Sequence, residues 1–206
     1  RLPRDLIEAE VEVIRAMGTE ILCNVTIGED VTIASTPKEL EAADRIVLPG
    51  VGAFERGMAG LHKFGLVDAL KRRVADEGIP LIGICLGMQV LSTIGFEYGK
   101  TRGLNFIEAE VKPILVDAKI PHMGFNTLEV LESSELLNGI ENKEFYFMHS
   151  FEVVNYKNVI SLTDYNGHKF VSSIQNNNIY GVQFHPEKSR KAGIKLFENF
   201  INIGIS

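Results

Sequence analysis

The stretch PLIGICLGMQ, residues 80–89, decides the fold of this chain. Its apolar run from Leu81 to Ile84 is typical of a buried strand, and the residues from Leu86 onward predict a helix. Between them, Gly83 and Gly87 lie two residues before and two residues after Cys85. Glycines at those two positions permit a sharp strand-to-helix turn, so the stretch predicts a nucleophile elbow.

Cys85 is therefore the candidate nucleophile. The free amides and the dipole of a helix N-terminus lower the pKa of a thiol placed there. The amide of Leu86, the next residue, would be placed to hold an oxyanion. A lone cysteine is often only a small buried hydrophobic residue, and that alternative stays open. The two flanking glycines favour the nucleophile.

A base for this thiol is expected at His185, in the stretch GVQFHPE, residues 181–187. Residues i and i+2 of an extended chain point the same way, so Glu187 can lie beside His185. An isolated His-x-Glu is often a surface loop. Together with the elbow, Cys85, His185 and Glu187 form a coherent triad of nucleophile, base and orienting acceptor.

A second loop carries closely spaced glycines. The apolar run 45–48 predicts a buried strand, and LPGVGAF, residues 48–54, follows at its end. Ligands of open parallel sheets bind at the carboxyl ends of the strands. Gly50 and Gly52 would let backbone amides approach a substrate closely. Taken alone, the pattern is more typical of a simple turn.

The rest of the chain extends this strand–helix alternation. Thr36, Pro37 and Glu39 form a helix start, and a helix is expected over 55–77, broken near Gly65. The second half holds short β-like runs and a final helix that Ser189 would cap; they are 106–111, 127–130, 145–148, 151–154, 159–162, 170–174, 179–184 and 191–203. We predict an α/β fold, a doubly wound, mostly parallel sheet with antiparallel additions, in a single domain spanning 1–206.

Composition narrows the functional classes. The 206 residues are 45% hydrophobic and 23% charged, which is ordinary for a globular protein, and the net charge of −6 argues against a general nucleic-acid binder. No window of eighteen apolar residues predicts a transmembrane helix, and no secretory signal is expected. Two cysteines make no disulfide framework, which favours a reducing cytoplasm. The five histidines and two cysteines lack metal-ligand spacing, so no metal or other cofactor is expected.

Taken together, these motifs resemble those of a known protein family. GICLGMQ, residues 83–89, and GVQFHPEKS, residues 181–189, resemble the class I (triad) glutamine amidotransferases. Within that family, three further stretches resemble the glutaminase subunits of imidazole glycerol phosphate synthases: LPGVGAF (48–54), PHMGFN (121–126) and YFMHSF (146–151). The motifs follow the family's order and cover about residues 35–203. The combination is far more specific than any single piece.

The resemblance implies a glutaminase that works through a thioester. The thiolate of Cys85 would attack the carboxamide of glutamine, and the amides of Leu86 and Val51 would hold the tetrahedral oxyanion. His185 would protonate the leaving ammonia and then activate water, with Glu187 orienting its ring. The positions that would bind glutamine are Gly50, Gly52, Gln89, Ser150 and Phe151.

The resemblance also implies a partner. In the family, a TIM-barrel cyclase subunit forms a heterodimer with the glutaminase, receives its ammonia, and makes imidazole glycerol phosphate and an aminoimidazole carboxamide ribotide in histidine biosynthesis. The residues expected at that interface are Tyr146, His122, Met123 and Asn126. No nucleic acid or membrane is expected as a partner.

Two alternatives stay open beside this interpretation. Phe125 stands where the family usually has tryptophan, which leaves room for a related amidotransferase subunit that feeds another acceptor, such as a sugar. A catalytically silent interaction subunit would keep the triad residues without their geometry.

The first 34 residues depart from the family pattern and make the first strand atypical. They resemble a segment of the small subunit of glutamate synthase instead. We expect a helix over 5–17, and either 20–25 or 31–34 in place of the family's first strand. Cys23, in this segment, is expected to be structural.

Overall fold

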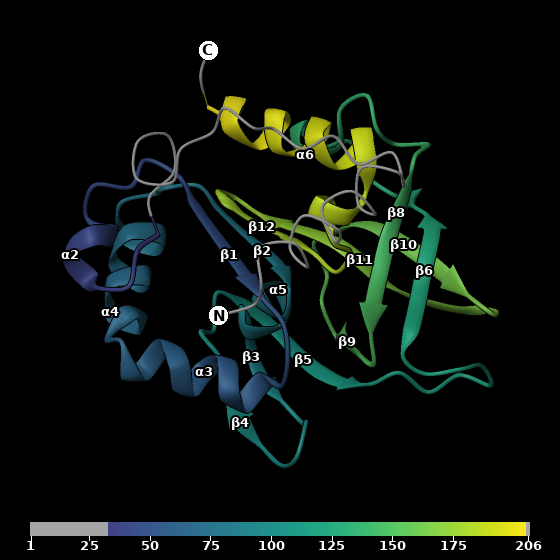
Figure 1. Ribbon diagram of the computed structural model, residues 1–206, viewed down its shortest axis with the longest axis horizontal. Coiled ribbons are helices and arrows are strands. Elements are labelled where there is room, and N and C mark those ends of the chain that lie inside the picture. Colours follow the sequence, from purple (N-terminus) through teal and green to yellow (C-terminus); the bar gives the residue numbers. More distant parts are fainter. Residues whose placement is uncertain (1–32, 205–206) are drawn as a thin grey trace, which may run out of the picture.

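The computed structural model describes residues 33–204, whose largest element is a six-stranded sheet (Figure 1). Its strand order is β1 (Ile46–Gly50), β2 (Leu81–Cys85), β12 (Ile179–Val182), β11 (His168–Asn176), β10 (Val159–Tyr165) and β7 (Glu129–Val130). The pairs β1–β2 and β2–β12 are parallel, and the remaining pairs are antiparallel. The predicted α/β class is confirmed, with a larger antiparallel share in the described residues than expected.

Two smaller sheets adjoin the large one. One has the order β4 (Thr101–Arg102), β3 (Ser92–Gly95), β5 (Ile107–Pro113) and β9 (Phe151–Val154). The other pairs β6 (His122–Thr127) with β8 (Glu144–His149) in antiparallel register. The strand expected over 127–130 is instead the end of β6 followed by β7. β6 itself was not predicted, because Gly124, at φ 141°, and the polar His122 and Asn126 leave only two apolar side chains, Met123 and Phe125, in the strand.

The first helices start and break where the sequence predicts. Thr36 and Glu39 form the predicted capping box of α2 (Pro37–Leu40). The long helical stretch divides into α3 (Phe54–Lys63), α4 (Leu66–Lys71) and the π-helical turn η1 (Arg72–Asp76). The break falls at Gly65, which has φ 66°. The remaining helical elements are α5 (Leu86–Val90), α6 (Arg190–Asn202) and the 3-10 turns η2 (Glu135–Leu137) and η3 (Pro186–Lys188).

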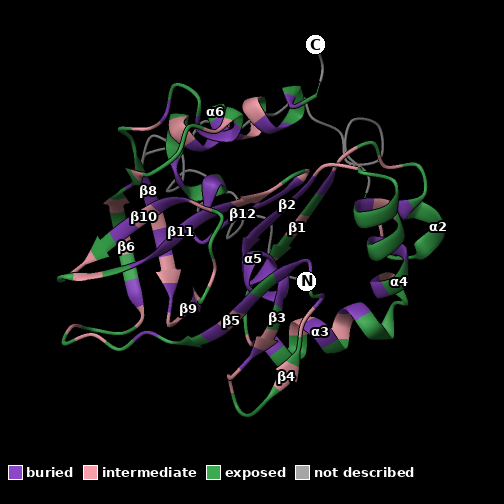
Figure 2. Cartoon of the chain, turned by 180° about the vertical axis from the view of Figure 1, so that it is seen from behind, coloured by how far each residue is buried: buried purple, intermediate pink, exposed green. Residues whose placement is uncertain are grey.

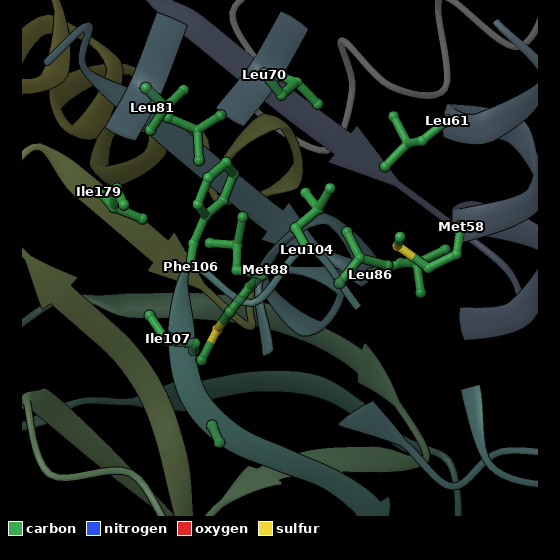
Figure 3. Packing of buried hydrophobic residues seen from close by; sticks show 14 of the residues in the cluster. Met58, Leu61, Leu70, Leu81, Leu86, Met88, Leu104, Phe106, Ile107 and Ile179 are labelled. Carbon is green, nitrogen blue, oxygen red and sulfur yellow. The ribbon is translucent and has the colours of Figure 1, made fainter. Parts of the chain in front are cut away.

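The large sheet separates two hydrophobic clusters. Alternate residues of β2 point to opposite faces, so Leu81 packs with side chains of α3, α4 and α5, whereas Ile82 packs with side chains of α6. Figure 3 shows part of the first cluster, in which Leu86 lies near Met58. All of β2 is buried, and Figure 2 shows buried strands at the centre with exposed faces on the outer helices. The elbow thus rests on a rigid, fully packed strand.

β1 corrects one expectation. Only Ile46 of this strand is buried, whereas the apolar run 45–48 predicted burial throughout. β1 is one of the two edge strands of the large sheet in the described residues, so parts of it stay open to solvent. β2, in contrast, has a partner strand on each side.

Most expectations for the N-terminal segment concern residues outside the described range. These are the helix over 5–17, the strand over 20–25, and the role of Cys23. Of the stretch 31–34, only Ile33 and Ala34 are described, and neither lies in a strand. None of the helices in 33–204 is long and apolar enough to cross a membrane.

Candidate active site

Cys85 lies at the turn from β2 into α5, where it is the last residue of the strand and the N-cap of the helix. Its backbone has φ 54° and ψ −110°. A residue with a side chain rarely adopts positive φ, and such strain is typical of functional sites. The turn therefore has the geometry of a nucleophile elbow, with the thiol presented at the carboxyl end of a central strand.

The flanking glycines are required by close backbone contacts. A Cβ added to Gly87 would lie 1.7 Å from the carbonyl oxygen of Leu48, in the middle of β1. A Cβ added to Gly83 would lie 2.7 Å from the carbonyl oxygen of Gly87. At Gly50 the added atom would meet Leu86 Cβ at 3.0 Å. The elbow is thus pressed directly against β1 itself.

A cavity of about 630 Å³ opens beside the thiol, a size typical of small-molecule sites. It brings together both reactive candidates, Cys85 and His185, and most of the residues expected to contact glutamine. Its lining includes Val51, Gly52, Cys85, Leu86, Gln89, His149, Ser150, Phe151 and His185. Gly50 and Glu187 do not line the cavity.

His185 and Glu187 form the expected pair. The Nδ1 atom of His185 and Oε1 of Glu187 are 2.7 Å apart, and the His185 side chain is only 2% exposed. Burial lowers the pKa of His185, but the neighbouring Cys85 and Glu187 side chains outweigh it and raise the pKa to about 9. Nε2 is buried and makes no hydrogen bond in the described part of the chain, although it lies on the side of the ring that faces the cavity and Cys85. The imidazolium thus has the carboxylate on one side and the thiol on the other.

Glu187 complements this charge. Burial raises the pKa of its carboxyl, but the hydrogen bond from His185 lowers the pKa, and the net value lies below the ordinary one. Glu187 is therefore ionised at neutral pH and can orient the imidazole ring.

Ser189 links the backbone of His185 to that of Tyr146. Its Oγ donates to the carbonyl of His185 at 2.6 Å and accepts from the amide of Tyr146 at 2.9 Å. The amide of His185 donates to the carbonyl of Tyr146 at 2.8 Å. Ser189 is the N-cap residue of α6, as expected, but its hydroxyl makes these contacts and does not bond to an amide of the helix. The backbone of His185 is thereby tied to β8.

Sequence reasoning missed a second group of polar side chains beside the cavity. His149 Nδ1 lies 2.9 Å from the carbonyl oxygen of Phe151, and its Nε2 lies 3.2 Å from Nδ1 of His122. Burial lowers the pKa of His149 to about 4, so its ring is neutral. The fully buried Gln183 contacts the thiol of Cys85. Gln183 belongs to the same motif as His185, which was the one available signal.

The residues expected at a partner interface divide into two groups. Met123 is exposed, and Tyr146 and Asn126 are partly exposed. The His122 side chain is only 3% exposed, so it cannot contact a partner as expected. Alternation along β6 turns it inward, where its ring stacks on Tyr165.

An aromatic and cationic patch surrounds the exposed members. The guanidinium of Arg190 lies 4.5 Å from the ring centroid of Phe125, and the ammonium of Lys188 lies 5.6 Å from that of Tyr146. The Phe125 and Tyr146 rings meet edge to face, with their centroids 5.4 Å apart. We call Met123, Phe125, Tyr146, Lys188 and Arg190 the β6–β8 surface. Aromatic and arginine side chains are enriched at protein interfaces.

Within residues 33–204, no group of three or more His, Cys, Asp or Glu side chains is arranged to hold a metal ion. The chemistry available in the cavity is that of a thiol, an imidazolium, a carboxylate and backbone amides. This set suits acyl transfer through a covalent intermediate.

Comparison with known proteins gives a consistent result. The family profile described as glutamine amidotransferase class-I matches residues 4–203. Imidazole glycerol phosphate synthase subunit HisH 1 of Campylobacter jejuni (strain RM1221) is 48% identical over 174 residues, which cover 83% of this chain and 87% of that protein. Subunit HisH of Moorella thermoacetica is 43% identical, over 84% of this chain and 83% of that protein.

Solved structures show the same fold. A protein from Thermoplasma acidophilum that is described as a GMP synthase subunit aligns with a TM-score of 0.62 and 24% identity, covering 94% of this chain and 85% of that chain. A crystal structure of a glutamine amidotransferase aligns with a TM-score of 0.64 and 16% identity, covering 94% and 93%. At these identities the likeness concerns architecture alone.

Proposed function

The chain belongs to the class I glutamine amidotransferases, and from this premise we propose that it is the glutaminase subunit of an imidazole glycerol phosphate synthase. The observation that carries the proposal is the placement of Cys85, His185 and Glu187. The thiol lies at an elbow on the wall of a cavity, and the buried imidazole beside it is hydrogen-bonded to the carboxylate. The similar HisH subunits supply the reaction in which such a site would act.

The proposed reaction divides amide hydrolysis into two steps. The Cys85 thiolate attacks the side-chain carbonyl carbon of glutamine. As the carbon–nitrogen bond breaks, His185 gives the proton on Nε2 to the departing nitrogen. Ammonia is released, and the acyl group stays on Cys85 as a thioester. His185 then removes a proton from water, which attacks the thioester and releases glutamate and the thiolate. Glu187 holds the Nδ1 side of the ring throughout.

Two backbone amides would stabilise the tetrahedral oxyanion. The amide of Leu86 starts α5 directly after the nucleophile, where the helix leaves it without an internal partner. The amide of Val51 belongs to the loop after β1, and both residues line the cavity. Gly52 has φ 101°, a conformation that residues with a side chain rarely adopt, and an added Cβ would meet no atom within 4 Å. Glycine is therefore required there by the backbone conformation and not by lack of space.

Glutamine would bind in the same cavity. Gly52, Gln89, Ser150 and Phe151 all line it, together with the thiol that would attack the substrate. Gly50 does not line the cavity, and it contributes instead by allowing the elbow to pack closely on the end of β1.

The partner in this proposal is a TIM-barrel cyclase subunit bound at the β6–β8 surface in a heterodimer. The ammonia would pass directly to a ribonucleotide intermediate on the cyclase, which protects it from protonation in bulk water. Tyr146 belongs to this surface, and its backbone amide and carbonyl are linked to Ser189 and His185. A partner bound here would therefore contact a residue that directly supports the catalytic base.

A decisive experiment measures glutamate release from glutamine by the purified chain, with and without a ligand-loaded cyclase subunit. We expect release that the cyclase strongly increases and that Cys85→Ser abolishes. Cys23→Ser, the same change at the other cysteine, serves as the matched control and should keep the activity.

Two other outcomes would change the proposal. Release that depends on Cys85 but does not respond to the cyclase would support glutaminase activity and contradict the cyclase as partner. It would favour the related amidotransferase subunit that feeds another acceptor, the alternative that Phe125 in place of tryptophan leaves open. An absence of release in both conditions would favour the silent interaction subunit.

A further inference from the structure

The Gln183 side chain occupies a place that the proposed mechanism does not use. It is fully buried at the end of β12, and its backbone amide donates to the carbonyl of Ser172 at 2.9 Å. Its Nε2 lies 3.6 Å from Sγ of Cys85, and its Oε1 lies 2.9 Å from Nε2 of Gln89. A buried carboxamide must find partners for its polar atoms, and here one of them is the nucleophile.

The neighbouring groups fix which end of this carboxamide faces the sulfur. The carbonyl oxygen of Phe151 can only accept, so Gln89 must present Nε2 to it, at 3.1 Å. The same nitrogen has a second hydrogen, which points to Gln183 and requires an acceptor there. Oε1 of Gln183 therefore faces Gln89, and the NH₂ group faces Cys85.

An N–H group aimed at the sulfur distinguishes its two protonation states. A thiol is a weak acceptor, whereas a thiolate accepts a hydrogen bond strongly and gains from any donor nearby. The thiol's own hydrogen has a different partner, the carbonyl oxygen of Met148, with Sγ and that oxygen 3.9 Å apart. Gln183 thus favours the reactive form, while Met148 favours the protonated form.

We propose that Gln183 is a positioning residue that donates a hydrogen bond to the Cys85 thiolate and fixes the orientation of Gln89 in the glutamine-binding cavity. Its consequence for catalysis rests on the proposed glutaminase function, but its contact with the sulfur does not. One carboxamide would then couple the reactivity of the nucleophile to the arrangement of a substrate-binding side chain.

The test compares two substitutions that separate these two contacts. Gln183→Glu has nearly the same shape and keeps an acceptor for Gln89, but it removes the donor that faces the sulfur. Gln183→Met keeps the bulk and removes both. Gln175→Met is the matched control, because Gln175 on β11 bonds with Ser134 and Tyr180 away from the cavity. Thermal unfolding of each variant reports whether it is folded.

The readout is the rate at which iodoacetamide alkylates Cys85 as a function of pH. Mass spectrometry of the peptide that contains Cys85 excludes any contribution from Cys23. We expect the midpoint pH of alkylation to rise by about one pH unit in Gln183→Met, a roughly tenfold lower rate below the midpoint, as for loss of a weak hydrogen bond to a charged group. Gln183→Glu should show at least this rise, and Gln175→Met none.

Wild-type behaviour in Gln183→Glu would overturn the proposal, because Gln183 would then only support Gln89. If the Glu variant does not fold, an unshifted midpoint in Gln183→Met would overturn it equally. A wild-type chain that releases no glutamate, yet shows the shift in both variants, would contradict the proposed function and leave the sulfur contact standing.

Discussion

The two sides of the site are built in different ways. The Cys85 thiol is placed by backbone packing, in which Gly83 and Gly87 of the elbow and Gly50 at the end of β1 leave room for close contacts. The His185 imidazole is placed by hydrogen bonds, with the Glu187 carboxylate bonded to its ring and the Ser189 hydroxyl bonded to its backbone carbonyl. The first side lies between β1 and α5, and the second lies between the end of β12 and the start of α6, next to β8.

This difference decides how each side responds to change. A backbone contact leaves no room for an added methyl group, so its disruption displaces a whole element. A hydrogen bond can be lost singly, at a cost of about 1–3 kcal/mol when a buried partner is left unsatisfied. We therefore expect abrupt losses from substitutions on the nucleophile side and graded losses on the base side.

The largest effect is expected for Gly87→Ala. Its Cβ would lie 1.7 Å from the Leu48 carbonyl oxygen, so β1 or the elbow must move. We expect the free energy of unfolding to fall by about 3 kcal/mol or more, and glutamate release to fall to the level of Cys85→Ser. Urea denaturation and the glutaminase assay measure both.

Gly60→Ala, on α3, is the control, because an added Cβ there meets no atom within 4 Å. We expect it to gain about 0.5–1 kcal/mol from helix propensity. Equal behaviour of the two variants would remove backbone packing as the basis of the nucleophile side.

Glu187→Gln should have the next largest effect. The amide keeps the size of the side chain but loses the charge that orients and supports the imidazolium. We expect turnover to fall on the order of 100-fold, as for a general acid–base residue held in the wrong state. Steady-state kinetics should show the loss in kcat. Glu198→Gln, on the exposed face of α6, should keep wild-type turnover, and a similar loss there would show that the site tolerates no change of charge anywhere nearby.

Ser189→Ala should have a smaller effect. It removes the acceptor of the Tyr146 amide and the donor to the His185 carbonyl, and Ser189 is buried. We expect a loss of about 1–3 kcal/mol in unfolding free energy and a roughly tenfold loss of turnover, because the base is held less firmly. The exposed Ser133→Ala is the control. Full turnover in Ser189→Ala would show that Glu187 alone positions the ring.

The subtlest expected effect is on the pH dependence of stability. The pKa of His185 is raised from 6.5 to about 9 in the folded chain, so the stability that its charge contributes is complete below pH 6.5 and is lost as the pH rises through about 9. The difference in unfolding free energy between the wild type and Glu187→Gln should therefore shrink between these two pH values. Denaturation curves across this window measure it, and a constant difference would show that the ion pair does not stabilise the fold.

The contrast between the two sides also explains what the sequence could predict. The elbow and the His-x-Glu pair are local patterns that each span a few consecutive residues, although Glu187 lies in the 3-10 turn η3 and not in the extended chain that was expected. The break at Gly65 and the capping box at Thr36 were predictable for the same reason. Each depends on a few consecutive residues and on conformations that other residue types adopt poorly.

The missed features depend on register between distant strands. His122 meets His149 because β6 pairs with β8 in a register that opposes these two residues, and no local pattern states that register. The contact between Gln183 and Cys85 likewise joins strands that are neighbours only in the folded sheet. The contacts of the Ser189 hydroxyl with His185 and Tyr146 were missed for the same reason, since the Tyr146 amide comes close only after folding.

The backbone angles of Cys85 give position 85 a meaning beyond chemistry. A side chain at φ 54° costs on the order of 1–3 kcal/mol relative to a relaxed conformation, and glycine would escape most of that cost. For the fold alone, glycine is thus the better residue here. In a lineage that no longer needed the reaction, Cys85 would be free to change to glycine, which the fold accommodates better. A retained cysteine therefore records continuing selection for activity at the expense of folding stability.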